Sequence, residues 1–228
     1  MAGKRSTTKE RLSRETIVAS ALALADAEGI GAVTIRRLAT DHGVTPMALY
    51  WHFKDKEALL DGLVEHVLDE IRTPSWPESD LPPWDVRVRQ CCEAILEGLA
   101  RHPEVADLVH HRFMGCAAGL DLAELTFAAL REGGFDDEQM SDIGVHALHT
   151  LVMLVTMEPG ENAVIYSADE VARRTREKRA SLEALEPGRY PTIIYCAPSL
   201  VSKTVNRRYQ NTGLEILIQG IRALQAQL

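Results

Sequence analysis

The chain lacks the cysteine and histidine patterns that mark disulfide frameworks and structural metal sites. Its four cysteines, Cys91, Cys92, Cys116 and Cys196, form no C-x-x-C pair and show no zinc-like spacing with histidines. Buried free thiols in a reducing compartment are the simplest account of them. We therefore expect neither a metal site nor a cofactor.

Long apolar runs are also missing. No stretch reaches the roughly 18 uncharged residues that span a bilayer, and the N-terminus is polar and basic without an apolar segment behind it. The chain has no Gly-rich phosphate loop, nucleophile elbow, H-E-x-x-H motif or convincing carboxylate pair. These absences argue against a membrane partner and against an enzyme, and they favour a cytoplasmic protein.

Charge is distributed unevenly along the chain. The 228 residues are 46% apolar and 25% charged, which is typical of a globular protein with one or two domains. The net charge is −8 in total, yet residues 1–56 contain nine Lys and Arg against six Asp and Glu. The net charge of that segment is +3 and that of the remainder is −11, so a basic N-terminal segment precedes an acidic remainder.

Helical periodicity over the first 72 residues predicts four helices. Ser13, Thr34, Thr45 and Asp55 stand where N-caps are expected, and Pro46 suits a first helical position. Gly29 and Gly43 offer the positive φ with which helices end. The expected elements are a helix from Ser13 to Glu28, one from Thr34 to Gly43, one beginning at Thr45 and Pro46, and a longer one from Asp55 to Arg72.

A proline-rich stretch then interrupts the helical pattern. Thr73 to Pro83 contains four prolines in eleven residues, which cannot continue a helix. We place a domain boundary there, between residues 1–72 and 84–228. Helical periodicity resumes at Trp84, breaks at Pro103 and returns from Leu120 to Leu130, so the predicted fold class is all-α.

The last third is also expected to be mainly helical. Residues 140–157 are unusually apolar, which suits a helix buried on several sides and ended by Glu158, Pro159 and Gly160. Residues 168–185 predict a charged helix, and residues 205–228 an amphipathic one. The apolar stretch 189–201 between them indicates either a loop or a short strand-like segment.

The stretch from Thr34 to Leu60 has the pattern of a helix-turn-helix. Two short helices are joined by a turn at Gly43, and the second of them has the size to enter the major groove of B-DNA. With Val44, Leu49 and Phe53 assigned to the core, the other side chains of that helix face outward. This outward face is a predicted DNA-binding surface.

The predicted DNA contacts combine small polar, aromatic and basic side chains. Tyr50 can donate its hydroxyl to a phosphate, Lys54 and Lys56 can neutralise phosphates, and Arg36 can reach a guanine edge or the backbone. A basic arm, Lys4, Arg5, Lys9, Arg11 and Arg14, can follow the DNA backbone or a minor groove. The alternative for these residues is a solvated surface without a partner. The full set of candidates is Thr34, Arg36, Thr45, Pro46, Met47, Tyr50, His52, Lys54 and Lys56.

These residues carry a resemblance to a known family. "GVTPMALYWHFKDKEALLDGL", after "TIRRLA" and the helix from Ser13 to Glu28, closely resembles the DNA-binding domain of the TetR family, the tetracycline-repressor-type bacterial regulators. The match is dense over about the first sixty residues. "GLEILIQGI" from Gly213 and "GGFDDEQ" from Gly133 resemble later parts of the same family.

The resemblance implies a fold, partners and a mechanism. It implies a homodimer in which two long C-terminal helices of each subunit form a four-helix interface. It also implies a second domain that binds a small-molecule effector and shifts the fourth helix, Asp55 to Arg72. Two recognition helices in one dimer predict a near-palindromic DNA operator.

Candidate ligand-binding residues lie in the second half. Phe113, Met114, Phe127, His149 and Met153 can line a pocket of mixed character, although side chains at helical spacing are commonly plain core. The resemblance adds His110, which lies near a histidine that coordinates drug-bound magnesium in the repressor that names the family. Other positions depart from that repressor: Arg72 replaces a histidine, Cys91 an asparagine and Ile95 a phenylalanine. These departures argue against tetracycline as the effector.

Two functions remain compatible with the sequence. The first is a ligand-responsive repressor that binds a palindromic operator as a homodimer and is released by a small molecule. The second is a DNA-binding head fused to an enzymatic or protein-interaction helical domain. Salt-sensitive binding to a palindrome that a small molecule relieves would favour the first.

Overall fold

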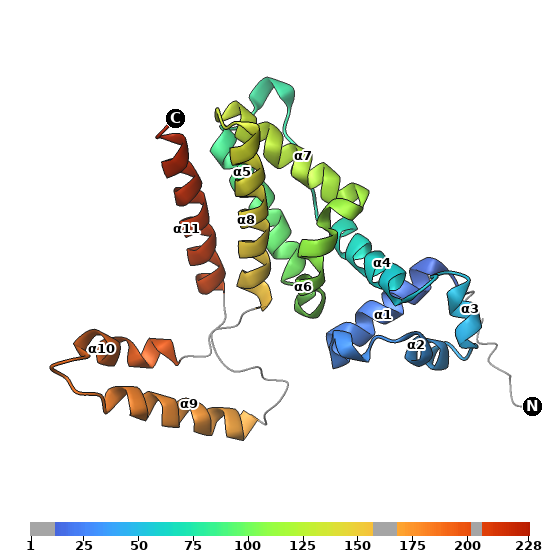
Figure 1. The fold of residues 1–228 in the computed structure, drawn as a ribbon, viewed down its shortest axis with the longest axis horizontal. Coiled ribbons are helices and arrows are strands. Elements are labelled where there is room, and N and C mark those ends of the chain that lie inside the picture. Colours follow the sequence, from blue (N-terminus) through green and yellow to red (C-terminus); the bar gives the residue numbers. More distant parts are fainter. Residues whose placement is uncertain (1–11, 157–167, 202–206) are drawn as a thin grey trace, which may run out of the picture.

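The described residues, 12–156, 168–201 and 207–228, form an assembly of helices. In this computed structural model they contain eleven α-helices and no strand, which confirms the predicted all-α class. Helices α1 to α3 lie at one end of the molecule and α4 leads from them into a larger helical body (Figure 1). Helices α9 and α10 form a hairpin that projects from that body.

Local sequence signals set the bounds of α1, Arg14–Glu28. The Thr16 N–H donates to the Ser13 hydroxyl at 3.2 Å, and the Ser13 N–H donates to the Thr16 hydroxyl at 2.9 Å. This reciprocal pair forms a capping box. The helix ends at Gly29, whose φ of 82° is open to glycine at little steric cost.

The next two helices form the predicted helix-turn-helix. Helix α2, Ile35–Asp41, packs against α3, Pro46–Tyr50, across a turn in which Gly43 has a φ of 64°. Thr34 caps α2 by accepting a hydrogen bond from the Arg37 N–H at 3.1 Å. Thr45 occupies the N-cap position of α3, but its side chain forms no capping hydrogen bond.

Helix α4, Lys56–Asp69, connects this end to the rest of the molecule. Asp55 begins it by accepting a hydrogen bond from the Ala58 N–H at 2.8 Å. Its apolar face includes Leu59, Leu63 and Val67, all fully buried. Because α4 packs against α1, α5, α6 and α7, a displacement of the body can reach the helix-turn-helix through it.

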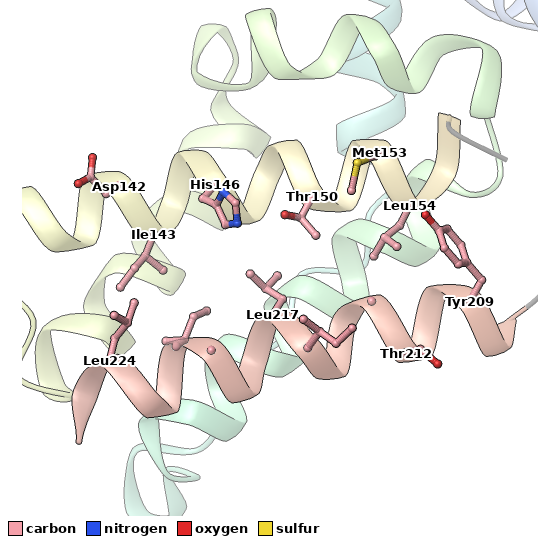
Figure 2. A pocket seen from close by; sticks show the side chains of 14 residues that line it. Asp142, Ile143, His146, Thr150, Met153, Leu154, Tyr209, Thr212, Leu217 and Leu224 are labelled. Atoms are coloured by element: carbon pink, nitrogen blue, oxygen red, sulfur yellow. The ribbon is translucent and has the colours of Figure 1, made fainter. Parts of the chain in front are cut away.

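The body is built from five helices, with α8 at its centre. They are α5 (Trp84–Leu99), α6 (Pro103–Arg112), α7 (Ala117–Glu132), α8 (Asp137–Thr156) and α11 (Arg207–Gln225). Helix α8 packs against the other four, as expected for a helix buried on several sides. Helices α8 and α11 run side by side along one edge (Figure 2).

The connections follow proline and glycine. The stretch Thr73–Pro83 contains no α-helix and only one short 3-10 turn, Glu78–Asp80. Pro103 occupies the first turn of α6, and Gly134 has a φ of 93° between α7 and α8. The division of the chain into two domains at Thr73–Pro83 stays a prediction. Glu158, Pro159 and Gly160, the expected end of α8, lie outside the described residues.

The hairpin of α9 and α10 differs in one respect from the structure that the sequence predicts. Helix α9, Ala168–Glu183, is the expected charged helix, but Pro191–Leu200 forms a helix, α10, where the sequence predicts a loop or strand-like segment. Ile194, Ala197 and Val201 recur at helical spacing, and Ala197 is fully buried in the hairpin. Pro191 is compatible with the helix because it occupies the first turn.

Among the described residues, only one bent pair of helices has the length and composition that could cross a membrane. No single helix there is both long and apolar enough to cross a bilayer. The segments Pro103–Gly115 and Ala117–Glu132, which meet at a 77° bend, pass a test of length and composition only when taken together.

Candidate nucleic-acid interface and ligand cavity

The outward face of α3 is exposed. Leu49 and Phe53 are buried in the core, while Thr45, Pro46, Met47 and Tyr50 face solvent. Trp51 directly follows Tyr50 and is 85% exposed. Among the large apolar side chains of the described residues, only Tyr195 is equally exposed. Trp51 lies between the predicted contacts Tyr50 and His52, but the predicted set of DNA contacts omits it.

The basic residues after α3 extend this surface. Lys54 and Lys56 are exposed, and Lys56 is the first residue of α4. His52 is half-buried. The pKa of Glu15 on α1 is lowered, first by hydrogen bonds from its own backbone N–H and from the Ser13 hydroxyl, and then by the nearby Arg14 and His52. The surface therefore combines cationic side chains with an aromatic edge.

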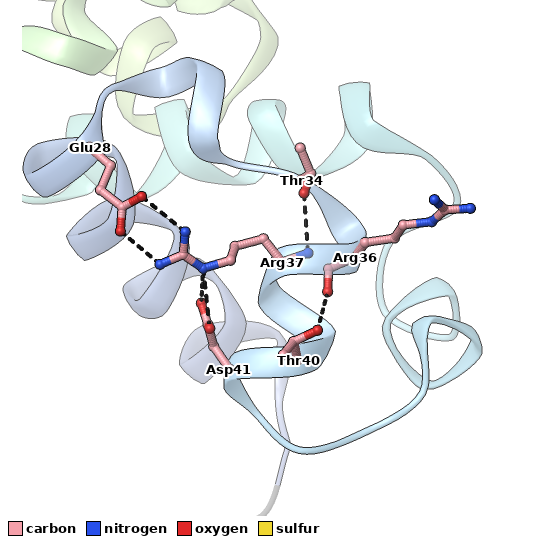
Figure 3. A network of polar contacts seen from close by, with 6 residues as sticks. All are labelled: Glu28, Thr34, Arg36, Arg37, Thr40 and Asp41. Carbon is pink, nitrogen blue, oxygen red and sulfur yellow. Dashed lines mark hydrogen bonds and ion pairs between the residues drawn. The ribbon is translucent and has the colours of Figure 1, made fainter.

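Arg36 and Arg37 of α2 differ sharply in their surroundings. The Arg37 guanidinium donates to Glu28 at 2.7 and 2.9 Å and to Asp41 at 3.1 and 3.2 Å. These hydrogen bonds raise the pKa of Arg37 and lower that of Glu28. Figure 3 shows Arg36 extended away from this cluster. Within the described residues, its guanidinium has no ion-pair partner.

A cavity of about 280 Å³ lies in the helical body and is partly open to solvent, since Met114 and Val145 in its wall are more than half exposed. It is lined by α5, α7, α8 and the short turn η3, Phe113–Gly115, and three of the predicted ligand residues, Phe113, Met114 and Phe127, belong to its wall. Other parts of its wall come from residues that the sequence analysis does not single out. Among these are Cys92, Leu122, Thr126, Ser141, Leu148 and Leu151.

The remaining predicted ligand residues lie elsewhere. His110 and His149 have ring centroids 5.6 Å apart, and the Nε2 atoms of His110 and His111 are 2.8 Å apart, but none of these histidines lines the cavity. Met153 lies in a different depression, so the expectation that it shares one pocket with Phe113 and Phe127 does not match the geometry. Within the described residues, no group of three His, Cys, Asp or Glu is placed to hold a metal ion.

Met153 belongs to an open groove of about 1020 Å³ between α8 and α11, which we call the outer groove. Figure 2 shows side chains of both helices directed into it, among them His146, Leu154 and Leu217. Ile216 is 70% exposed and Leu224 50% exposed on its α11 side. Its lining is mostly apolar, which is unusual for a surface that faces only water.

Ion pairs join the body to the helix-turn-helix end. Arg112, at the end of α6, donates to Glu57 and, at 2.9 Å, to Asp61, both on α4. His102, before α6, lies 3.0 Å from Asp26 of α1 and 3.3 Å from Glu70 after α4. The partners lie 32 to 76 residues apart in the chain, and no sequence periodicity links them.

Comparisons with known proteins agree with these features. Residues 17–63 match the model of the bacterial regulatory proteins of the tetR family, and residues 76–225 match that of the tetracyclin repressor-like C-terminal domain. The chain is similar to the class D tetracycline repressor of Escherichia coli, with 32% identity over 92% of this chain and 89% of the relative.

Two further similarities differ in extent. The class C tetracycline repressor of Escherichia coli is 47% identical, but only over 70 residues, so the match spans about a third of that relative's length. Among solved structures, the Streptomyces coelicolor TetR family protein ActR in complex with actinorhodin is similar with a TM-score of 0.76 and 26% identity. That match covers 94% of this chain and 99% of the other.

Proposed function

The chain belongs to the TetR family of bacterial regulatory proteins, and from this premise we propose that it represses transcription as a homodimer bound to a near-palindromic operator, which a small-molecule effector releases. At the coarser level, it is a transcriptional regulator with a helix-turn-helix DNA-binding domain and a ligand-binding domain. The operator, the dimer and the release by effector are the proposed parts.

The exposed face of α3 and its surroundings carry the proposal. Thr45, Pro46, Met47 and Tyr50 are assigned to the major groove, where Tyr50 can also reach a phosphate. Arg36, whose guanidinium has no ion-pair partner among the described residues, is assigned to a guanine edge or a phosphate. The backbone contacts are assigned to Thr34, His52, Lys54 and Lys56, together with Trp51, which is exposed directly after α3.

The outer groove supports the homodimer. A second copy related by a two-fold axis would cover the apolar side chains of α8 and α11 with the same side chains of its own. Such an interface resembles a domain core divided between two chains, which is typical of obligate dimers. Two copies would also present two α3 helices to neighbouring half-sites, as a near-palindromic operator requires.

A continuous set of contacts supports release by a ligand. Phe113 and Met114 form part of the cavity wall, and the preceding residue, Arg112, is paired with Glu57 and Asp61 of α4. A ligand that displaces the turn after Arg112 would therefore alter the position of α4 and of the helix-turn-helix attached to it. Effector binding and operator binding then oppose each other because they favour different arrangements of the same helix.

The decisive experiment is selection of genomic DNA fragments by the purified protein, followed by gel-shift titration of the selected site. We expect a near-palindromic sequence, an affinity that falls steeply with salt, and about tenfold or greater weakening for Arg36→Ala. Arg176→Ala is the matched control, because Arg176 is exposed on α9 and far from α3 in the fold.

Two results would contradict the proposal. One is fragment selection without any shared sequence. The other is an Arg36→Ala variant that binds the selected site as tightly as Arg176→Ala does. The alternative of an enzymatic C-terminal domain gains no support from the cavity, since its lining carries no carboxylate or imidazole among the described residues.

A further inference from the structure

The cavity in the body is lined by uncharged groups. Fourteen described residues form its wall, and their polar side-chain groups are the Cys92 thiol and the hydroxyls of Thr126 and Ser141. Burial raises the pKa of Cys92 to about 12, so its thiol is protonated at neutral pH. A charged ligand placed here would lose its hydration without gaining an opposite charge, which is strongly unfavourable.

The shape and wall of the cavity favour rings. Its 280 Å³ is nearly twice the roughly 150 Å³ of an apolar protein cavity that accepts one benzene molecule. Phe113 and Phe127 offer ring faces and edges, and Met114 offers a polarisable sulfur, all of which pack well against aromatic ligands. The space therefore suits about two fused rings.

A single hydroxyl inside the wall can fix the orientation of such a ligand. The Thr126 hydroxyl donates to the carbonyl of Leu122 at 2.8 Å, so its proton is engaged within α7. The oxygen also lies beside the Cys91 thiol, and its second lone pair can still accept a hydrogen bond. A hydroxyl or N–H on the ligand would satisfy it.

We propose that this cavity binds an uncharged, largely aromatic ligand of two fused rings that donates a hydrogen bond to Thr126, and not an anionic metal chelate. This inference rests on the proposed function, since it names the effector class for the same regulator. The groups that would serve a chelated metal, His110, His111 and His149, lie outside the cavity wall.

The test compares two probes with the same ring system. 2-Naphthol is uncharged at pH 7, whereas 2-naphthoate is an anion, and calorimetric titration of the full chain measures both. We expect 2-naphthol to bind and 2-naphthoate to bind roughly a hundredfold more weakly. Tetracycline with Mg²⁺ serves as the metal-chelate probe and is expected to bind more weakly than 2-naphthol.

A pair of threonine variants locates the binding. Thr126→Val removes the hydroxyl from the cavity and is expected to weaken the binding of 2-naphthol roughly fivefold. Thr156→Val is the matched control: the Thr156 hydroxyl forms the same kind of bond, to the Val152 carbonyl at 3.1 Å, but Thr156 does not line the cavity. It should leave 2-naphthol binding unchanged.

Three outcomes overturn the inference. They are no binding of 2-naphthol, equal or tighter binding of 2-naphthoate or of tetracycline with Mg²⁺, and equal effects of the two threonine variants. The gel shift on the selected operator is read separately. If 2-naphthol binds in the cavity but leaves the operator complex intact, the proposed release of the operator by an effector is contradicted. The inference about the chemical class of the cavity ligand is then still supported.

Discussion

Neighbouring arginines on α2 show how local charge decides which side chain is available to a partner. Arg37 is held by two carboxylates, one on α1 and one a helical turn away, whereas Arg36 extends into solvent without a partner in the described chain. Sequence alone identifies the pair as basic. It does not show that Glu28, nine residues earlier, engages one and leaves the other, because that depends on how α1 packs beside α2.

The Arg37–Glu28 pair leads to a pH prediction. The pKa of Glu28 is lowered, first by its hydrogen bonds with Arg37. The pair therefore stabilises the fold above the ordinary glutamate value of 4.5, and this contribution is lost as the pH falls through the folded-state value. We expect Glu28→Gln to lower the urea midpoint slightly at pH 7, and the difference from the wild type to shrink as the pH falls through the lowered folded-state pKa of Glu28. A deficit that stays constant as the pH falls would contradict this electrostatic account.

At the scale of elements, the turn between α6 and α7 depends on a glycine. Gly119, in the first turn of α7, lies so close to Phe113 that a Cβ would overlap the Phe113 carbonyl. The obstacle is backbone, so it cannot rotate away as a side chain would. Because this turn connects the cavity wall to Arg112, the close approach also fixes the contact between α6 and α4.

Gly119→Ala is therefore expected to lower the free energy of unfolding by about 2 kcal/mol or more. Urea denaturation of the purified protein measures this. Gly31→Ala is the control: Gly31 lies in the 3-10 helix Ile30–Ala32 with open space where a Cβ would stand, so a change within about 0.5 kcal/mol is expected. Equal effects of the two substitutions would show that the contact with Phe113 is not the cause.

Elements with a clear period and clear caps could be predicted from the sequence. Ser13, Thr34 and Asp55 form the expected caps, and Gly29 and Gly43 adopt the expected positive φ. Helix α10 could not be predicted, because its Thr-Ile-Ile-Tyr run has high β propensity and Pro198 lies inside the helix, where proline is unfavourable. Packing against α9 outweighs those local preferences.

At the scale of the molecule, the faces of α8 explain why the lining of the candidate ligand cavity is only partly predictable from the sequence. Helical spacing shows which residues of α8 share a face, but not which helix covers it. Leu148 and Leu151 face the inner cavity, whereas His146, Thr150 and Met153 face the outer groove beside α11. Phe113, Met114 and Phe127 meet in one cavity because η3 and α7 converge there with α5 and α8, a consequence of tertiary packing alone.

The outer groove yields a prediction for the whole assembly. Ile216 is exposed on α11, so in the single chain its replacement by glutamate removes little packing. In a two-fold interface the same substitution places a carboxylate in an apolar contact on both subunits, and each buried, unpaired charge costs several kcal/mol. We expect Ile216→Glu to weaken dimerisation by roughly a hundredfold or more, as measured by light scattering across a concentration series.

The control and the operator titration separate loss of the dimer from loss of the fold. Leu81→Glu places the same charge on an exposed leucine of the proline-rich stretch that does not line the outer groove, and should remain dimeric. Ile216→Glu should keep the wild-type helical content, yet bind the palindrome weakly, because a monomer reaches one half-site and loses the gain from the second. If Ile216→Glu stays dimeric and binds normally, the two copies must meet through another surface, and the spacing of their α3 helices would have to be derived anew from that contact.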